Sequence, residues 1–363
     1  MGGPVGDRRS AIVESGPAAF HKTFREIHPL AMRLVRNRLD RKDRYLREML
    51  KYALEKQRLS EYGFVLKYCF CRKEREGTRI RKFAAAAHLL QTSTFISDDI
   101  FDRSDLRYGR KAIYVKYGVS YAILAAELLQ SIALEILSAE LARGKFAHAG
   151  RVIQLFHEIV TTTYLSQFID LYTAANPRVT PREYYRGIAL GPARFLANLA
   201  QSGALLAGKP PGEVERLARF GYHYGMGLFI TDDIVDIVSE PGEGWKSFAS
   251  DLKGQRMRLP MILALRQGSR RDTRFLKGFL TKTRVSNADV HAAAKVIRNS
   301  GALEACRAIA RGHLNRALDS ISGMEPSLTT KNLRWLCESL FAAQGIGHKQ
   351  HLGVTRGRQQ PRG

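Results

Sequence analysis

The stretch FISDDIFDRSD, residues 95–105, decides what fold to expect, and FITDDIVDIVSE, residues 229–240, repeats its pattern. Each follows an apolar run and carries three aspartates spaced Asp-Asp-x-x-Asp. Residues i and i+4 share one face of a helix, so Asp98 and Asp102 are expected to point the same way. Either copy alone is explained by a solvated acidic helix end or by pairing with arginine. Two copies at the ends of apolar helices indicate a shared cation site.

Carboxylates beside such apolar stretches require a compensating charge. If the two helices face each other, the carboxylates that converge are Asp98, Asp99, Asp102, Asp232, Asp233 and Asp236. They cannot all stay ionised without cations. Mg²⁺ is the natural partner because it takes hard oxygen ligands and prefers sites that it shares with substrate phosphates. We therefore expect a Mg²⁺ site that receives a diphosphate, with basic residues nearby.

The hydrophobic pattern predicts one all-α domain. From Pro17 onward, apolar residues recur at three- and four-residue intervals, and no stretch alternates as a strand would. Long helical patterns cover residues 79–102, 117–142, 150–175, 181–208 and 211–238. We expect a flexible N-terminus over residues 1–17, a helical domain over residues 18–342 and a disordered basic tail over residues 343–363.

The composition limits the classes of partner. The 363 residues include 58 Lys and Arg against 34 Asp and Glu, a formal charge of +24, which attracts polyanions such as diphosphates. No zinc-finger spacing or aromatic-basic motif favours nucleic acid. No secretory signal and no apolar run of about 18 residues is present, so we expect no transmembrane segment. Four cysteines without zinc or disulfide spacing indicate a reduced, cytoplasmic protein.

Several motifs in order resemble the trans-isoprenyl diphosphate synthases, the family that includes farnesyl and geranylgeranyl diphosphate synthases. The resemblance runs from about residue 77 to residue 265. DDIFDRSDLRYG (residues 98–109) and ITDDIVD (residues 230–236) are similar to the family's two aspartate-rich motifs. SQFIDL (residues 166–171) resembles its Gln-x-x-Asp-Leu segment, and WKSFASDLKGQRMRLPMILAL (residues 245–265) resembles the segment after the second motif.

That resemblance implies an isoprenoid-synthase-type helical bundle around a deep central cavity, acting as a homodimer. In the family, Mg²⁺ bound by both motifs grips an allylic diphosphate, whose carbon–oxygen bond ionises. Isopentenyl diphosphate attacks the allylic cation, and loss of a proton gives a longer trans-isoprenyl diphosphate. Such a mechanism matches the sequence, because metal and guanidinium would meet the developing negative charge while apolar helices enclose the hydrocarbon.

The resemblance also assigns residues. The best metal-ligand candidates are Asp98, Asp102 and Asp232, and the weaker ones are Asp99, Asp233 and Asp236. The expected diphosphate-binding side chains are Arg79, Gln91, Arg107, Gln167, Lys246 and Arg256, with Asp170 beside Gln167. The side chains expected to be catalytic are Asp98, Asp102, Asp232, Arg107 and Lys246.

Chain length in the family depends on the residues four and five positions before the first motif. Here these are Thr94 and Ser93, which are small, so a C20 substrate or product is expected in preference to C15. Residues four apart share a helix face, so both side chains are expected to point toward the cavity if Asp98 does. Phe95 or Tyr121 closing the cavity instead is the alternative.

The sequence departs from the family where a second diphosphate would bind. Thr78 replaces a lysine, Tyr108 replaces the second arginine after the first motif, and Gly191-Pro192 replaces a Lys-Thr pair, although Arg194 follows one turn on. Each lost charge-assisted bond costs about 1.5–3 kcal/mol, so weak binding of isopentenyl diphosphate is expected.

Three functions stay open. One is chain elongation with isopentenyl diphosphate. Another is the same ionisation with a different nucleophile, either in terpene cyclisation or in prenyl transfer to a non-isoprenoid acceptor such as an indole. The third is a non-catalytic subunit of a heteromeric prenyl synthase. Such subunits commonly lose an aspartate motif, whereas this chain retains both.

Overall fold

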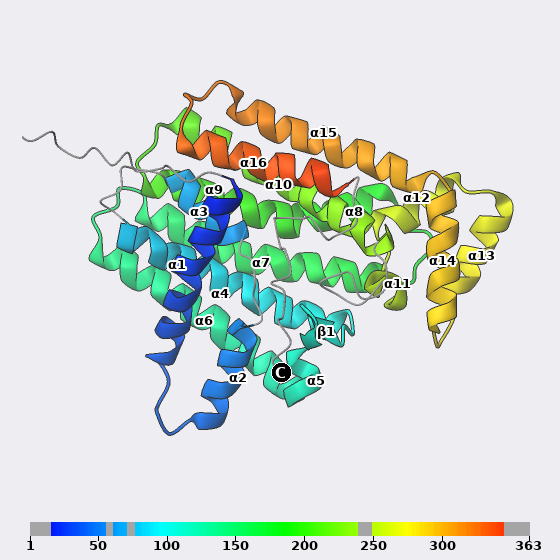
Figure 1. Ribbon diagram of the computed structural model, residues 1–363, viewed down its shortest axis with the longest axis horizontal. Helices are drawn as coiled ribbons and strands as arrows, with labels where there is room; N and C mark the ends of the chain where they lie inside the picture. The colour runs from blue at the N-terminus through cyan, green and yellow to red at the C-terminus, as the bar shows by residue number, and fades with distance from the viewer. Residues whose placement is uncertain (1–15, 56–60, 71–76, 239–248, 345–363) are drawn as a thin grey trace, which may run out of the picture.

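A computed structural model of the protein describes residues 16–55, 61–70, 77–238 and 249–344. Figure 1 shows long helices running along the molecule, with shorter ones across one end. In chain order the elements are α1 (Pro17–Arg36), α2 (Arg44–Glu55), α3 (Glu61–Phe70), α4 (Gly77–Phe101), β1 (Leu106–Arg107), β2 (Arg110–Lys111), α5 (Ile113–Tyr117), α6 (Val119–Arg143), α7 (Ala149–Thr173), α8 (Pro181–Ile188), η2 (Ala189–Ala193), α9 (Arg194–Leu206), α10 (Pro211–Val238), α11 (Ser250–Lys253), α12 (Leu259–Gln267), α13 (Arg270–Leu280), α14 (Asn287–Asn299), α15 (Ala302–Ser322) and α16 (Leu328–Ala343).

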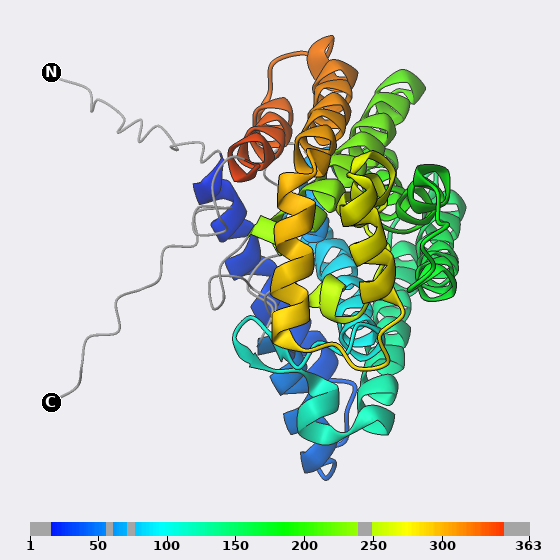
Figure 2. The ribbon, with the colours of Figure 1, turned by 90° about the vertical axis from the view of Figure 1, so that its right-hand side faces the viewer.

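The long helices form the body of the bundle, as the all-α prediction required. α4 packs against α6, while α10 packs against both α9 and α15. Figure 2 shows these helices from one end, with α13 and α14 across it. One apolar core joins α1–α7 with α9, α10, α15 and α16, and a second joins the end of α10 to α8 and α11–α15. Phe229 packs against both cores, so the second acidic motif begins where they meet.

A small β-hairpin follows the first motif, which the sequence did not predict. Leu106 pairs with Lys111 and Arg107 with Arg110 in antiparallel register. Tyr108 and Gly109 form the turn with φ values of 52° and 73°, and two consecutive left-handed residues are typical of a two-residue type I′ turn. Strands of two residues are too short to show alternation in a sequence. Tyr108, expected as a lost arginine, thus serves as a turn residue.

The expected helix over residues 181–208 is interrupted. Its middle is a π-helical turn, η2, which contains Gly191 and Pro192. A side chain at position 191 would place its Cβ only 2.4 Å from Oγ of Ser166 on α7. Glycine therefore allows η2 to approach α7 closely. The replaced Lys-Thr pair lies in this turn, and Arg194 just beyond it is exposed.

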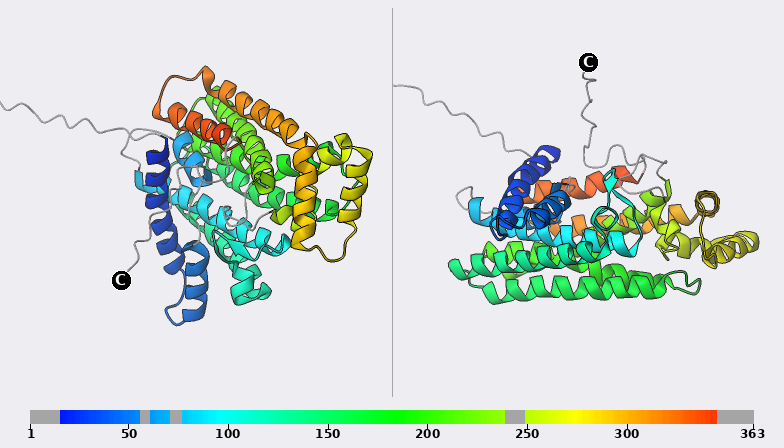
Figure 3. Two further views of the ribbon diagram at one scale, coloured as in Figure 1. Left: turned by 45° about the vertical axis from the view of Figure 1, so that its right-hand side comes forward. Right: turned by 90° about the horizontal axis from the view of Figure 1, so that it is seen from below.

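Two long helices, α6 and α7, form one outer layer of the molecule (Figure 3, right). By length and composition α6 is apolar enough to cross a membrane, the only such helix in the part of the chain that the structure describes. Of its most apolar window, 44% is buried in the fold, and a core helix passes the same test. The exposed side of the layer is rich in large apolar side chains: Val119, Tyr121, Ile123, Leu124, Tyr164, Leu165, Phe168, Leu171 and Tyr172.

The described helices start at Pro17 and end at Ala343. Residues 1–15 and 345–363, which hold most of the two flexible ends expected from the sequence, lie outside the described residues. The boundaries of the single helical domain, residues 18–342, therefore stay a prediction.

Candidate active site

The first acidic motif lies at the C-terminal end of α4, where its three carboxylates face different partners. Asp98 is partly exposed and accepts a hydrogen bond from the Nε2 amide of Gln167 on α7. Asp99 and Asp102 are buried. Because Gln167 reaches Asp98, the structure brings together the first motif and the Gln-x-x-Asp-Leu segment, a contact that the sequence did not predict.

Asp99 forms a buried ion pair with Arg107 of the hairpin. Nε and Nη2 of Arg107 donate to Oδ1 of Asp99 at 2.9 and 2.7 Å. The guanidinium also lies 4.7 Å from the centroid of the Phe95 ring. Burial opposes the charge of Arg107, but Asp99 outweighs it and raises the pKa of the arginine. Arg107 is thus anchored by the motif itself.

The second motif, at the end of α10, is engaged mainly by protein donors. Asp233 is buried, and its Oδ2 accepts from the hydroxyl of Tyr184 at 2.6 Å and from the backbone N–H of Leu259 at 3.3 Å. Asp236 accepts from the backbone N–H groups of Ser250 and Asp251, at 3.1 and 3.2 Å. Asp236 therefore anchors the start of α11.

Asp232, the first residue of this second motif, differs from its neighbour. It is partly exposed, whereas Asp233 is buried. Asp98 and Asp232 are thus the corresponding first residues of the two motifs, and both are partly accessible.

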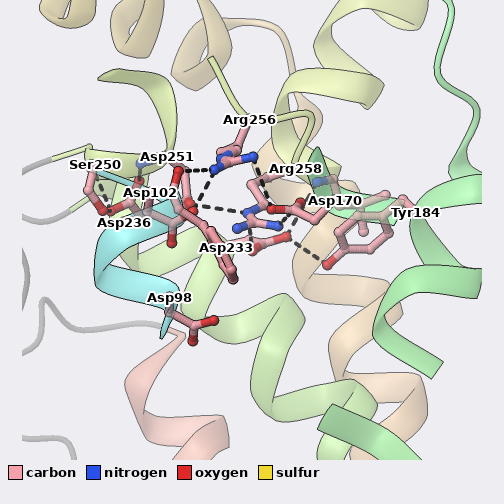
Figure 4. A network of polar contacts seen from close by, with 12 residues as sticks. Asp98, Asp102, Asp170, Tyr184, Asp233, Asp236, Ser250, Asp251, Arg256 and Arg258 are labelled. Carbon is pink, nitrogen blue, oxygen red and sulfur yellow. Dashed lines mark hydrogen bonds and ion pairs between the residues drawn. The ribbon is translucent and has the colours of Figure 1, made fainter. Parts of the chain in front are cut away.

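Two arginines between α11 and α12 connect the motifs (Figure 4). Arg256 lies 3.1 Å from Asp102 of the first motif and 3.5 Å from Asp170 on α7. Arg258 donates to the other oxygen of Asp170 and lies 3.9 Å from Asp233 of the second motif. Asp170 is therefore the carboxylate through which the two arginines, and so the two motifs, are joined.

Burial in this network shifts the acidities of its members. Burial raises the pKa of Asp233 to about 7, although Arg258 opposes the shift. Burial also raises the pKa of Asp170, against the effect of its two arginines. The pKa of the Tyr184 hydroxyl is raised well above its ordinary value, first by burial and then by Asp233. Tyr184 therefore stays protonated and donates to Asp233.

Arg79 does not join this cluster. It lies 19 residues before Asp98 on the same uninterrupted helix, α4. At about 1.5 Å of rise per residue, the two are about 28 Å apart along the axis. The exposed guanidinium of Arg79 instead lies 5.7 Å from the ring centroid of Phe146. This separation argues against its assignment to a diphosphate site beside the first motif, because a short Gly-x-Arg run does not fix its distance from the motif.

The other expected diphosphate ligands differ in their distance from the acidic cluster. Gln91 is buried two turns before Asp98 on α4. Arg256 lies at the cluster, on Asp102. Lys246 lies outside the described residues, and the side chain of Thr78 is likewise not described.

A pocket opens beside α4, just before the first motif. It encloses about 350 Å³ of space, part of it open to solvent, and its walls come from α4, α6, α7 and α9. The lining residues are Leu90, Ser93, Thr94, Ser97, Gln130, Ile159, Val160, Thr163, Tyr164, Gln167 and Phe195. Ser93 and Thr94, the expected chain-length residues, are among them, whereas Phe95 and Tyr121 are not.

The pocket is less polar than its residue types suggest. The hydroxyls of Ser93 and Thr94 donate to the carbonyls of Leu90 and Gln91, at 2.9 and 2.8 Å. Because these hydroxyls bond to carbonyls of their own helix, the carbon atoms of the two side chains face the pocket. The pocket is therefore suited to a hydrocarbon chain.

Sequence reasoning missed Arg258 and Tyr184. Arg258 was read as part of a motif segment without a role, although two arginines one residue apart precede an apolar helix. That spacing was the available signal, because a basic residue entering a buried segment needs an acidic partner. Tyr184 gave no signal, since its contact with Asp233 spans 49 residues.

The carboxylates fit a divalent ion only in part. Among the described residues, no three acidic, histidine or cysteine side chains form a cluster that could hold a metal ion. Asp99, Asp233 and Asp236 are engaged by protein donors. Asp98 and Asp102 are contacted by Gln167 and Arg256, and carboxylate oxygens are the hard ligands that Mg²⁺ prefers. Among the motif carboxylates named here, Asp98 and Asp232, the first residues of the two motifs, are partly exposed and so accessible to an ion.

Comparison with known proteins settles the family. Residues 43–297 match the family described as polyprenyl synthetase. The chain belongs to that family. The match begins 34 residues before the start expected from the sequence motifs and so includes α2.

Individual relatives agree with this polyprenyl synthetase assignment. Heptaprenyl diphosphate synthase component 2 of Geobacillus stearothermophilus is 30% identical over 68% of this chain and 73% of its own. Geranylgeranyl diphosphate synthase of Methanosarcina mazei is 29% identical over 66% of this chain and 71% of its own. A Caulobacter crescentus polyprenyl synthase, solved with calcium and isoprenyl diphosphate, has the same fold, with a TM-score of 0.81 at 19% identity over 91% of this chain and 98% of that one.

The predicted family and its all-α fold are thus confirmed. Membership makes this polyprenyl synthetase an enzyme of the prenyltransferase class. Family membership does not specify the metal, the acceptor or the product length. The geometry of the site is the basis for proposing each of them.

Proposed function

We propose that this polyprenyl synthetase elongates an allylic diphosphate with isopentenyl diphosphate to a C20 trans-isoprenyl diphosphate. One observation carries the proposal. The same helix, α4, presents Asp98 at its end and Ser93, Thr94 and Ser97 to an apolar-walled pocket immediately before it. An acidic group that can bind metal and diphosphate thus adjoins a space suited to a hydrocarbon tail.

In this proposal Mg²⁺ is held by Asp98, Asp102 and Asp232. When bound, the ion neutralises diphosphate and stabilises the negative charge that develops as the carbon–oxygen bond ionises. Gln167 orients Asp98 through its amide, and Arg256 fixes Asp102 against the backbone of α4. The carbon-lined pocket excludes water from the hydrocarbon, so the allylic cation meets the double bond of the second substrate before it meets water.

A basic surface beside the first motif is our candidate for the second diphosphate, in place of Arg79. Tyr52 on α2 donates to the carbonyl of Lys111 in the hairpin at 2.9 Å. The cationic groups of Arg110 and Lys116 lie 4.5 and 3.8 Å from the Tyr52 ring centroid. Arg47 lies on the same helix, within the family match. Tyr52 thus gathers cations from the hairpin and α5, while Arg47 lies on the same helix as Tyr52.

The exposed apolar layer of α6 and α7 supports the proposed homodimer. Phe168 and Tyr172 stack one turn apart, with ring centroids 6.1 Å apart and exposures of 68% and 77%. Large contiguous apolar patches on a surface commonly mark interfaces. Analytical ultracentrifugation of a Phe168→Asp variant tests the pairing, which predicts a monomer. A variant that sediments like the parent protein would place the interface elsewhere.

We also propose a cytoplasmic setting. Cys306 and Cys337 are free thiols, and both are buried. Free thiols are the ordinary state in a reducing compartment.

One incubation tests the function. The full chain is supplied with Mg²⁺ and a labelled C15 allylic diphosphate, with isopentenyl diphosphate present or withheld, and products are identified by mass. The proposal expects a C20 diphosphate only when isopentenyl diphosphate is present. Release of diphosphate with a cyclised or acceptor-bound product would favour the other nucleophile.

One observation favours a second function. A relative that is 30% identical is named as one component of a heptaprenyl diphosphate synthase. If this chain is likewise one subunit, the purified protein alone would form no product in the same incubation.

A further inference from the structure

Gln255, just after α11, has a backbone conformation that its residue type disfavours. Its φ is 52°, in the left-handed region. Its N–H donates to the carbonyl of Leu252 at 2.9 Å, and the next N–H, that of Arg256, donates to the carbonyl of Asp251 at 2.8 Å. Two such bonds form the Schellman motif that ends many helices, in which the left-handed residue is usually glycine. A glutamine in this position persists only where surrounding contacts stabilise it.

The side chain of Gln255 makes such contacts. Its Nε2 amide lies 3.0 Å from each of three backbone carbonyl oxygens, those of Phe279, Leu280 and Lys282. They lie at or just past the C-terminal end of α13, where a helix leaves its last carbonyls without intrahelical donors. The carbonyl of Gln255 also accepts from the backbone N–H of Ala175, just past α7, at 2.9 Å. Gln255 therefore holds the segment after α11 between the ends of α7 and α13.

This segment carries the two arginines that contact the acidic cluster (Figure 4). Arg256 directly follows Gln255 and lies 3.1 Å from Asp102 and 3.5 Å from Asp170. Arg258 donates to Asp170 as well. A backbone fixed beside the arginines leaves their guanidinium groups fewer positions to sample, so their ion pairs form at a smaller loss of conformational entropy.

Glycine at position 255 would serve the backbone better. It adopts a left-handed φ without strain and would keep both bonds of the Schellman motif. What it would lose is the amide that reaches α13. A residue that breaks a local preference next to a functional cluster, and that makes a specific contact in return, indicates a functional role.

We propose that Gln255 is a positioning residue for the reaction, whose amide, bonded to the end of α13, holds Arg256 and Arg258 against the carboxylates of the acidic cluster. The two guanidinium groups then keep Asp102 and Asp170 in one arrangement during turnover. The inference rests on the proposed function for its effect on turnover, whereas the placement of the arginines is measured without substrate.

The first test measures the reactivity of these arginines. The full chain is treated with phenylglyoxal, which modifies accessible guanidinium groups, and the modified peptides are quantified by mass spectrometry. In Gln255→Gly, Arg256 and Arg258 are expected to react about tenfold faster than in the parent, the factor that corresponds to the loss of one hydrogen bond. Arg107, which is buried against Asp99, is the internal control and should react at the parent rate.

Gln255→Glu gives a matched comparison, because it keeps the length of the side chain and removes its amide donors. It should behave like Gln255→Gly, while Gln267→Glu, at an exposed glutamine, should behave like the parent. If Gln255→Gly does not fold, Gln255→Asn is judged by the same criteria, because asparagine tolerates the left-handed region and its amide is one methylene too short to keep the same bonds.

Turnover gives the second test. In Gln255→Gly the kcat is expected to fall by up to about 100-fold, the effect of a small misplacement of catalytic groups. The KM for isopentenyl diphosphate, whose proposed site lies on α2 and the hairpin, should stay at the parent value. Arginines that react at the parent rate in a folded Gln255→Gly variant would overturn the proposal, and so would faster modification with an unchanged kcat. If the parent forms no elongated product, the proposed function fails, whereas the modification rates still decide whether Gln255 holds the arginines.

Discussion

The Nη2 atom of Arg107 lies 2.7 Å from Oδ1 of Asp99, and the two side chains are only 3% and 5% exposed. The pair joins the hairpin to the end of α4. From this geometry we infer an anchoring role for Arg107, whereas its expected contact with the allylic diphosphate stays a prediction. Removing one partner of a buried pair leaves an uncompensated charge.

We therefore expect Arg107→Met and Asp99→Asn each to lower the free energy of unfolding by about 3–5 kcal/mol. The double variant should cost less than the sum, because the residues are coupled. Urea denaturation measures all three. The exposed pair Arg151–Glu158 is the control, and its loss should cost at most about 1 kcal/mol. If Arg107→Met keeps parent stability but raises the KM for the allylic substrate, the anchoring role is wrong.

The first residues of the two motifs should matter most for turnover. Asp98 and Asp232 are partly exposed and are the proposed metal ligands. Asp98→Asn and Asp232→Asn are each expected to cut turnover by orders of magnitude with little change in helix content by circular dichroism. Asp105→Asn, a neighbouring exposed carboxylate, is the matched control and should retain activity. Near-normal turnover in either motif variant would rule out the metal assignment.

The length of the product should depend on the size of the side chains in the pocket wall. Ser93 and Thr94 both line the pocket, so Ser93→Phe with Thr94→Phe should fill it and shorten the product. Each methylene that the chain can no longer bury costs about 0.8 kcal/mol of binding. Thr94→Val keeps the volume and removes only the hydroxyl, so it should leave the product unchanged. Mass spectrometry of the products decides, and an unchanged distribution in the double variant would place the floor elsewhere.

The two candidate sites for isopentenyl diphosphate, at the start of α4 and on α2, predict opposite effects of substitution on the KM. A lysine at Thr78 and an arginine at Tyr108, which the sequence motifs suggest as repairs, lie far apart, because residue 78 precedes Asp98 by 20 positions of one helix. We expect Arg47→Ala to raise the KM for isopentenyl diphosphate about 10- to 100-fold, the effect of losing one charge-assisted bond. Arg79→Ala should leave it unchanged. Steady-state kinetics measure both variants. A raised KM in Arg79→Ala together with an unchanged KM in Arg47→Ala would refute the α2 assignment.

Acid should destabilise the protein through His88. This side chain is fully buried on α4, and its Nε2 lies 3.4 Å from Nδ1 of His28. Burial, then His28, lowers the pKa of His88 to about 3. Between pH 6.5 and about 3 the unfolded chain binds a proton there that the folded chain does not, so stability falls as pH falls through that window.

The slope for one such proton is about 1.4 kcal/mol per pH unit. His88→Leu should flatten the dependence of unfolding free energy on pH between 6 and 4, whereas the exposed His157→Leu should not. Urea midpoints across this range measure it. Equal slopes in the parent and His88→Leu proteins would show that the acid sensitivity arises elsewhere.

The sequence predicted the long helices well because a buried helix face repeats every three or four residues over many turns. The boundaries expected for residues 79–102 and 211–238 agree closely with α4 and α10. Through the family resemblance it also indicated that Gln167 belongs to the site, although not that it contacts Asp98. These features are local or are fixed by motifs of several residues.

What escaped prediction depends on contacts across the fold. The role of Arg258 follows from carboxylates on α7, α10 and α11, which only the folded chain brings together. The π-turn η2 follows from its approach to Ser166, and the hairpin is too short to have a pattern. The assignment of Arg79 rested on two matching residues, Gly77 and Arg79, which carry no information about the distance from the first motif.

The uninterrupted course of α4 has a consequence for how such enzymes diversify. Asp98 and the pocket residues before it are rigidly linked by one helix, in which each turn advances about 5.4 Å. Substitutions at Thr94, Leu90 or further back would move the end of the tail space in steps of about one turn without disturbing the headgroup end. An insertion or deletion between them would rotate the pocket residues by about 100° relative to Asp98, because one turn holds about 3.6 residues. Point changes, and not length changes, are therefore the tolerated route by which this segment can acquire a new product.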